Sequence, residues 1–128
     1  MVSTRRIVQQ AKTYDLPVMF HSCGNISDII PDLIECGVDM IDPIQVSAEN
    51  MSTENLRGFA GKISFHGGVS TQSTLPFGTA EEVRESTVKL IQALGPFGLV
   101  VAPDQEIMEG TPTENIQALF DAVHEYKP

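Results

Sequence analysis

Residues 79–102, TAEEVRESTVKLIQALGPFGLVVA, contain an amphipathic helix followed by a short apolar strand. Thr79 and Glu82 have the spacing of a capping box at the start of the helix, and Gly95 marks its end. One stripe at helical spacing is expected to face the core and consists of Val83, Thr87, Leu90, Ile91 and Leu94. The strand at residues 98–102 is apolar on both faces, which is typical of a parallel sheet. The stretch therefore predicts a helix–strand unit of an α/β fold.

The same alternation runs along the preceding part of the chain. A first helix is predicted near residues 3–14, and buried strands are predicted at residues 16–20, 38–44 and 62–66. The helix after the first strand carries Ile30, Leu33 and Ile34, with Pro31 in its first turn and Gly37 just past its end. Ser52 is expected to cap a short helix with Leu56 and Phe59 that ends at Gly61.

A last helix is predicted after residue 110. Thr111 is expected to be its cap, Pro112 to lie in its first turn, and Glu114 to complete a capping box. The residues expected to pack on the core are Ile116, Leu119, Phe120 and Val123. Short connections between parallel strands require right-handed crossovers, so residues 1–128 are predicted to form one α/β domain with four strands. An open sheet and half of a (β/α)₈ barrel both fit this pattern.

Composition excludes several classes of function. The chain has 8 Lys and Arg against 17 Asp and Glu, a formal charge of −9, so nucleic acid is an unfavourable partner. No apolar run approaches a transmembrane length, and no signal-peptide core follows Arg5 and Arg6, which predicts a cytoplasmic protein. In that compartment Cys23 and Cys36 are expected to be free or metal-bound. Cys36, at a helix end, is expected to be a buried apolar residue.

Reactive side chains follow each predicted strand, where α/β folds place their ligand sites. These strand ends carry His21–Asn25, Asp42–Gln45, His66–Gln72 and Asp104–Glu106. We expect Asp42, Gln45, His66 and Gln72 to contact a substrate. Asp42 before Pro43 is also a common turn starter, and Gly67 and Gly68 favour a close backbone approach or a tight turn over phosphate binding. His124, on the last helix, is expected to face solvent.

His21 and Cys23 are two residues apart at a strand end, so their side chains share one face. A histidine and a thiolate suit zinc, which takes three protein ligands in catalytic sites. The candidates for the third ligand are His66, Asp104 and Glu106, all predicted at the same rim. A hydrogen-bonded histidine beside an inert thiol is the alternative interpretation.

The chain resembles the C-terminal half of the uroporphyrinogen decarboxylase superfamily. The resemblance rests on the strings His21–Ile26, Pro31–Ile34, Asp42–Gln45, Phe65–Val69, Leu75–Thr79 and Pro112–Ile116. It implies the last four strands of a (β/α)₈ barrel. The His-x-Cys pair resembles the zinc-dependent methyltransferase branch, in which His21 and Cys23 match two zinc ligands. That branch has a third ligand, a cysteine near the last strand, which this sequence lacks. An oxygen ligand from Asp104 or Glu106 is the expected substitute, and of the two we predict Glu106.

The resemblance implies methyl transfer between a corrinoid protein and a thiol-type acceptor. A porphyrinogen decarboxylase and an inactive half-barrel that serves in assembly are the alternatives. Because four strands leave two unpaired edges, we expect a homodimer or pairing with the N-terminal half of a barrel.

Overall fold

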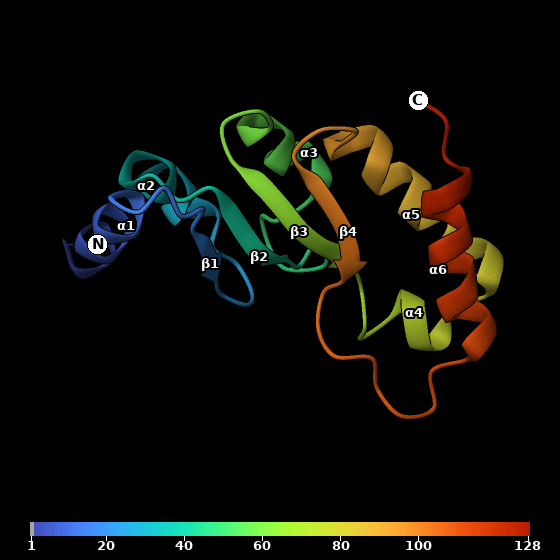
Figure 1. Ribbon diagram of the computed structural model, residues 1–128. Helices are drawn as coiled ribbons and strands as arrows, with labels where there is room; N and C mark the ends of the chain where they lie inside the picture. The colour runs from blue at the N-terminus through green and yellow to red at the C-terminus, as the bar shows by residue number, and fades with distance from the viewer. Residues whose placement is uncertain (1) are drawn as a thin grey trace.

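The structure is a computed structural model that describes residues 2–128 (Figure 1). Four parallel strands form one sheet in the order β1-β2-β3-β4. Their bounds are Met19–His21 for β1, Met40–Ile44 for β2, Ser64–Val69 for β3 and Leu99–Pro103 for β4. Each strand pairs with the next strand in the sequence, so the sheet has no point at which its order reverses, unlike a doubly wound sheet. The fold is therefore a set of four consecutive (β/α) units, half of a (β/α)₈ barrel, as the sequence predicts.

Within residues 2–128, six α-helices and two short 3₁₀ helices precede, connect and follow these strands. The α-helices are α1 (Val2–Lys12), α2 (Ile30–Cys36), α3 (Thr53–Leu56), α4 (Thr74–Phe77), α5 (Ala80–Leu94) and α6 (Thr113–Glu125), and the 3₁₀ helices are η1 (Ser27–Ile29) and η2 (Arg57–Phe59). Figure 1 shows α1 and α2 beside the first strands and α5 and α6 beyond β4. Among residues 2–128 no helix is long and apolar enough to cross a membrane.

The two faces of the sheet differ in burial. Ile41 and Phe65 are partners in register and lie fully in the core, against the helices. On the opposite face, Met19 and Val100 are 52% and 45% exposed. We call this second surface the open face; it also carries His21, Asp42 and His66. The open face corresponds to the interior of a closed barrel.

The helix at residues 80–94 forms as its sequence predicts. Thr79 accepts a hydrogen bond from the Glu82 backbone N–H, and the Glu82 carboxylate accepts one from the Thr79 N–H, so the capping box is complete. At Gly68, φ is +94° and a Cβ would lie 2.6 Å from Leu90 Cδ2. Glycine there lets α5 approach β3 closely, which confirms the interpretation of the glycine pair. The strand itself continues through Gly67 and Gly68 to Val69, three residues beyond its predicted end.

The first predicted strand is displaced and less buried than expected. Residues 16–20 were expected to be buried on both faces, whereas β1 is Met19–His21 and the side chains of Leu16 and Met19 are exposed. The reason is the position of β1 at the edge of the sheet, where one strand and one helix layer cover it. Its apolar residues therefore point toward a surface that this half-barrel leaves open.

Two expectations for α6 are wrong. Pro112 occupies the N-cap without a side-chain cap bond, so Thr111 and Glu114 form no capping box. Phe120 and Val123 are exposed, and the helix packs through Asn115, Ala118, Leu119 and Ala122. Asn115 explains the rotation, because its buried Nδ2 donates to Leu75 O at 2.9 Å and to Gly78 O at 2.7 Å. Once that side chain is fixed, small alanines face α5 and the aromatic residue faces outward.

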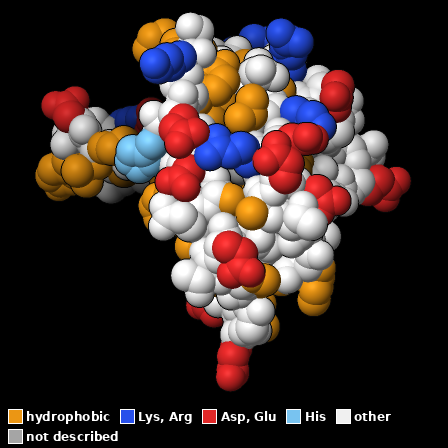
Figure 2. All heavy atoms as spheres, turned by 90° about the vertical axis from the view of Figure 1, so that its right-hand side faces the viewer, with side chains coloured by type: hydrophobic (Ala, Val, Ile, Leu, Met, Phe, Trp, Pro, Cys, Tyr) orange, Lys and Arg blue, Asp and Glu red, His pale blue; other side chains and the backbone are white. Residues whose placement is uncertain are grey.

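The outer surface of α5 and α6 carries interspersed acidic and basic side chains (Figure 2). Arg84 on α5 donates to Glu125 on α6 at 2.7 Å, which ties the two helices together at their surface. Hydrophobic side chains are scattered among the charges on this face. Such a mixed pattern is typical of a solvated helical layer.

Candidate functional site

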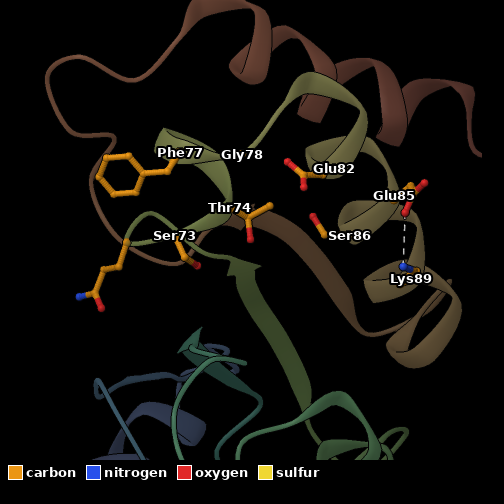
Figure 3. A pocket seen from close by; sticks show the side chains of 9 residues that line it. Ser73, Thr74, Phe77, Gly78, Glu82, Glu85, Ser86 and Lys89 are labelled. Atoms are coloured by element: carbon orange, nitrogen blue, oxygen red, sulfur yellow. Dashed lines mark hydrogen bonds and ion pairs between the residues drawn. The ribbon is translucent and has the colours of Figure 1, made fainter.

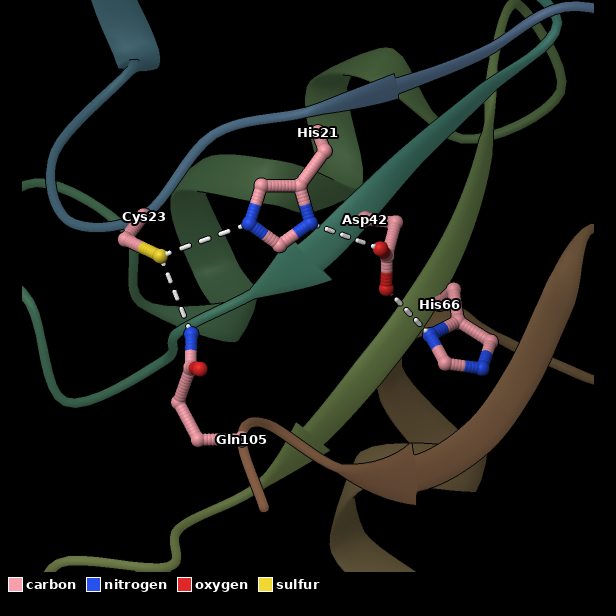
Figure 4. Close-up of polar contacts among 5 residues, drawn as sticks. All are labelled: His21, Cys23, Asp42, His66 and Gln105. Carbon is pink, nitrogen blue, oxygen red and sulfur yellow. Dashed lines mark hydrogen bonds and ion pairs between the residues drawn. The ribbon is translucent and has the colours of Figure 1, made fainter.

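Two histidines share one carboxylate on the open face (Figure 4). His21 Nδ1 donates to Asp42 Oδ2 at 2.9 Å, and His66 Nδ1 donates to Asp42 Oδ1 at 2.6 Å. The strand register produces this arrangement: His21 and Asp42 are partners between β1 and β2, and His66 follows on β3. The structure therefore brings together three of the predicted site residues. Asp42 acts as an orienting group and lies inside β2, so the interpretation of Asp42 as a turn starter is wrong.

The Asp42 carboxyl remains ionised in this network. Partial burial acts to raise its pKa, but the hydrogen bonds from His21 and His66 outweigh that effect, so its pKa lies below the ordinary value. An ionised carboxylate that accepts from both Nδ1 atoms leaves the Nε2 atom of each ring free of that proton. In its neutral form each imidazole therefore has the Nδ1–H tautomer, with Nε2 available as an acceptor or a metal ligand.

Cys23 lies beside the free nitrogen of His21. The distance from Cys23 Sγ to His21 Nε2 is 3.7 Å, and Gln105 Nε2 donates to the same sulfur at 3.0 Å. With zinc bond lengths of about 2.0–2.1 Å to nitrogen and about 2.3 Å to sulfur, two tetrahedral ligands lie about 3.6 Å apart. The His21–Cys23 pair therefore has the spacing and the donor types of two zinc ligands.

Within the described part of the chain no group of three His, Cys, Asp or Glu side chains is arranged to hold a metal ion. Asp104, one of the candidates for the third ligand, is 2% exposed, and its Oδ1 accepts from both N and Oγ1 of Thr71 at 2.9 Å. It fastens the loop after β3 to the end of β4 and is unsuited to a metal. His66 Nδ1 donates to Asp42 as His21 Nδ1 does, which leaves His66 Nε2 available, so His66 also stays a prediction as a ligand. Glu106 stays a prediction as the third ligand.

A polar cavity of about 380 Å³ opens next to Cys23. Its walls are Cys23, Gln45, Thr71, Gln72, Gln105, Glu106 and Met108. Gln45, Gln72 and Glu106 thus lie with Cys23 at one cavity, while Asp42 and His66 lie in the adjoining network. Gln45 Oε1 accepts from Gly24 N at 2.6 Å and holds the loop after β1 against the end of β2. The cavity has the size of a small-molecule site.

The remaining sequence predictions for reactive residues have clear outcomes. Cys36 is a free, buried thiol, and His124 is exposed, with its Nδ1 2.9 Å from Phe120 O. Gln105 was not expected to contact Cys23, because 82 residues separate the two. Thr71 and Met108 were also missed as cavity residues; Thr71 lies in the polar string after β3, whereas nothing in the sequence marks Met108.

Another hollow, of about 560 Å³, lies between α4 and α5 (Figure 3). Its charged groups are satisfied locally: Glu82 belongs to the capping box, and Lys89 lies 3.5 Å from Glu85. Phe77 at its edge is exposed. Because no histidine or cysteine lines this hollow, the cavity beside Cys23 is the better candidate site.

Comparison with known proteins supports the fold and the family. In the comparison with solved structures, a methyltransferase from Methanosarcina mazei matches with a TM-score of 0.73 and 24% sequence identity. The match covers 95% of this chain and 35% of that chain, so the present sequence spans about a third of the neighbour's length. No curated protein matches the sequence. The family model described as uroporphyrinogen decarboxylase (URO-D) matches residues 1–126, and the chain therefore belongs to that family.

Proposed function

We propose that this protein is a zinc-dependent methyltransferase that moves a methyl group between a corrinoid protein and a thiol-type acceptor. The observation that carries the proposal is the His21–Cys23 pair, whose Nε2 and Sγ atoms lie 3.7 Å apart while Asp42 holds the opposite ring nitrogen. A carboxylate bonded to the far nitrogen is the usual support of a zinc-binding histidine. A methyltransferase among proteins of similar fold is consistent with this activity.

The role of each side chain in this proposal follows from its contacts. Asp42 fixes the tautomer of His21, and His66 in turn holds Asp42 in place. Gln105 Nε2 donates to Cys23 Sγ at 3.0 Å and holds the sulfur at the cavity. Zinc held by His21 and Cys23 would supply Lewis acidity, which would make a bound substrate thiol nucleophilic near neutral pH. Gln45, Gln72 and Glu106 line the space in which that substrate would lie.

The proposed site needs more than this chain. His21 and Cys23 are two protein ligands, and we propose Glu106, on the cavity wall, as the third. The methyl group would be carried by a corrinoid protein that docks on the rim. Since a barrel site draws groups from several strand ends, four further strands, from a second copy or another half-barrel, would complete it.

X-ray absorption at the zinc edge tests this proposal. The zinc-loaded chain is expected to show one sulfur ligand, and addition of 2-mercaptoethanol is expected to add a second sulfur. Ethylene glycol, which lacks the thiol, should add none. In Cys23→Ser the protein sulfur should be lost, whereas Cys36→Ser should match the unchanged chain. If 2-mercaptoethanol leaves the sulfur count unchanged, zinc does not bind the thiol and the proposed function is wrong.

A further inference from the structure

The rim of the half-barrel carries no lysine or arginine. We define the rim segments as residues 21–27, 42–52, 66–79 and 103–112, which follow or end the four strands. None of the eight Lys and Arg residues lies in these segments. The carboxylates in them are Asp42, Glu49, Asp104, Glu106 and Glu109. An anionic ligand at this rim would therefore meet five carboxylates and no Lys or Arg of this chain.

The cavity beside Cys23 has the same character. Of the side chains that line it, Glu106 is the one that carries a full charge by type, and the others are amides, a hydroxyl, a thiol and a thioether. Thr71 Oγ1 already donates to Asp104, and Gln105 Nε2 already donates to Cys23. A ligand with a sulfonate or carboxylate would lose its hydration here without gaining a counter-charge.

Gln45 supplies one uncommitted donor to this cavity. Its side chain is 9% exposed, and the Gly24 N–H bound to Oε1 fixes which end of the amide is the oxygen. No hydrogen bond from Gln45 Nε2 to any atom of residues 2–128 is present, although the residue lines the cavity. No buried side-chain nitrogen or oxygen of the described residues lacks a partner, so Gln45 Nε2 is open to solvent at the cavity. Its N–H groups can donate to an acceptor oxygen of a ligand bound there.

We propose that the cavity selects an uncharged thiol whose hydroxyl, ether or amide oxygen accepts a hydrogen bond from Gln45 Nε2, and that it rejects thiols with a sulfonate or carboxylate. This inference rests on the proposed function, because it names the substrate class of the same site. The Glu106 carboxylate repels an anionic head group. Gln45 Nε2 donates a hydrogen bond to a neutral acceptor oxygen. Both side chains line the cavity that contains Cys23.

The test compares 2-mercaptoethanol with 2-mercaptoethanesulfonate, which differ only in the head group. Cobalt(II), which takes the same nitrogen and sulfur ligands as zinc, reports thiol binding through its visible absorption. The cobalt-loaded chain is expected to bind the neutral thiol about tenfold or more tightly than the sulfonate, since one unit charge near a carboxylate changes affinity on that order. Equal or tighter binding of the sulfonate would overturn the inference.

Two matched variants test whether the preference for the neutral thiol arises in the cavity. Gln72→Lys adds a positive charge to the cavity wall and is expected to reduce the preference for the neutral thiol about tenfold. Gln117→Lys adds the same charge on the exposed surface of α6 and is expected to leave the preference unchanged. Differences in acidity between the two thiols cancel, because the same ratio is compared among variants. Equal shifts in both variants would contradict a role for the cavity.

The cobalt spectrum distinguishes failure of this inference from failure of the proposed function. A cobalt spectrum that responds to both thiols but favours the sulfonate overturns the inference and leaves the methyltransferase proposal standing. A cobalt spectrum that responds to neither thiol overturns the proposed function, and the inference with it.

Discussion

His21 and Asp42 face each other across neighbouring parallel strands, with His21 Nδ1 2.9 Å from Asp42 Oδ2. The contact turns His21 Nε2 toward Cys23 Sγ. The Asp42 carboxylate therefore orients the His21–Cys23 pair without contacting Cys23. Because Asp42 also accepts from His66, three strands contribute to the orientation of one imidazole ring.

Asp42→Asn should weaken zinc binding about 10- to 100-fold, because loss of a residue that supports a ligand has typically that effect. An amide can accept from only one of the two histidines, so His21 loses its fixed tautomer. The measurement is competition for zinc against a chelator of known affinity. Asp32→Asn, an exposed site on α2, is the matched control and should bind zinc like the unchanged chain. Equal affinities for the two variants would show that Asp42 does not support a ligand.

Phe65→Ala should lower the free energy of unfolding by about 3–5 kcal/mol, because it leaves a cavity between the sheet and its helices. Phe65 is 1% exposed and is one of the largest fully buried side chains. Phe97 is 89% exposed, and Phe97→Ala should change stability by no more than about 0.5 kcal/mol. Urea unfolding followed by circular dichroism measures both. An equal decrease in the free energy of unfolding for Phe65→Ala and Phe97→Ala would contradict the assignment of Phe65 to the core.

The ion pair of Lys12 with Asp39 should stabilise the fold near neutral pH and not in acid. Hydrogen bonds from Lys12 and from the Val18 backbone N–H hold the pKa of the Asp39 carboxyl below its ordinary value of 3.8. A carboxyl whose pKa is lowered by folding stabilises the folded state above its ordinary pKa, and the stabilisation is lost as the pH falls through its folded pKa. Because both side chains are partly exposed, the effect should be about 0.5 kcal/mol.

A double-mutant cycle with Lys12→Met and Asp39→Asn measures that coupling. Urea unfolding at pH 7 is expected to show a favourable interaction energy between the two side chains. At a pH well below 3 the interaction should vanish, because the carboxyl is protonated in both states. A coupling that is the same at both pH values would contradict an ionic contribution.

The chain should self-associate. Strands β1 and β4 are unpaired edges, and the open face exposes Met19 and Val100. Two copies related by a two-fold axis can pair β1 of one with β4 of the other, which closes eight parallel strands. Each copy carries a formal charge of −9, so association should strengthen as salt is raised. Light scattering at micromolar concentration is the measurement, and a well-folded 13.9 kDa monomer at high salt would contradict closure by a second copy.

Local sequence signals predicted the parts of the fold that depend on local chemistry. The capping box of Thr79 and Glu82 is a contact between residues three apart, and it forms as expected. The meeting of His21, Asp42 and His66 followed from a general rule, since the carboxyl ends of parallel strands lie at one edge of the sheet. Register then decides the exact contacts, and register depends on the assembled sheet.

The features that the sequence could not supply depend on distant partners. Asn115 rotates α6 through two backbone carbonyls near α4, which lie 37 and 40 residues away in the chain. Asp104 is a candidate ligand by its position in the sequence. In the structure its carboxylate accepts hydrogen bonds from Thr71 of the neighbouring loop. The contact of Gln105 with Cys23 joins the two ends of the sheet, so it depends on the curvature of all four strands.

The central claim is that His21 and Cys23 bind zinc in common, and elemental analysis of purified protein tests it most directly. The unchanged chain and Cys36→Ser should each carry zinc in equimolar amount after loading and gel filtration, because Cys36 is buried away from the rim. Cys23→Ser should lose the metal, since removal of a direct ligand costs more than the 10- to 100-fold loss typical of a supporting residue. Equal zinc content in Cys23→Ser and Cys36→Ser would contradict the account.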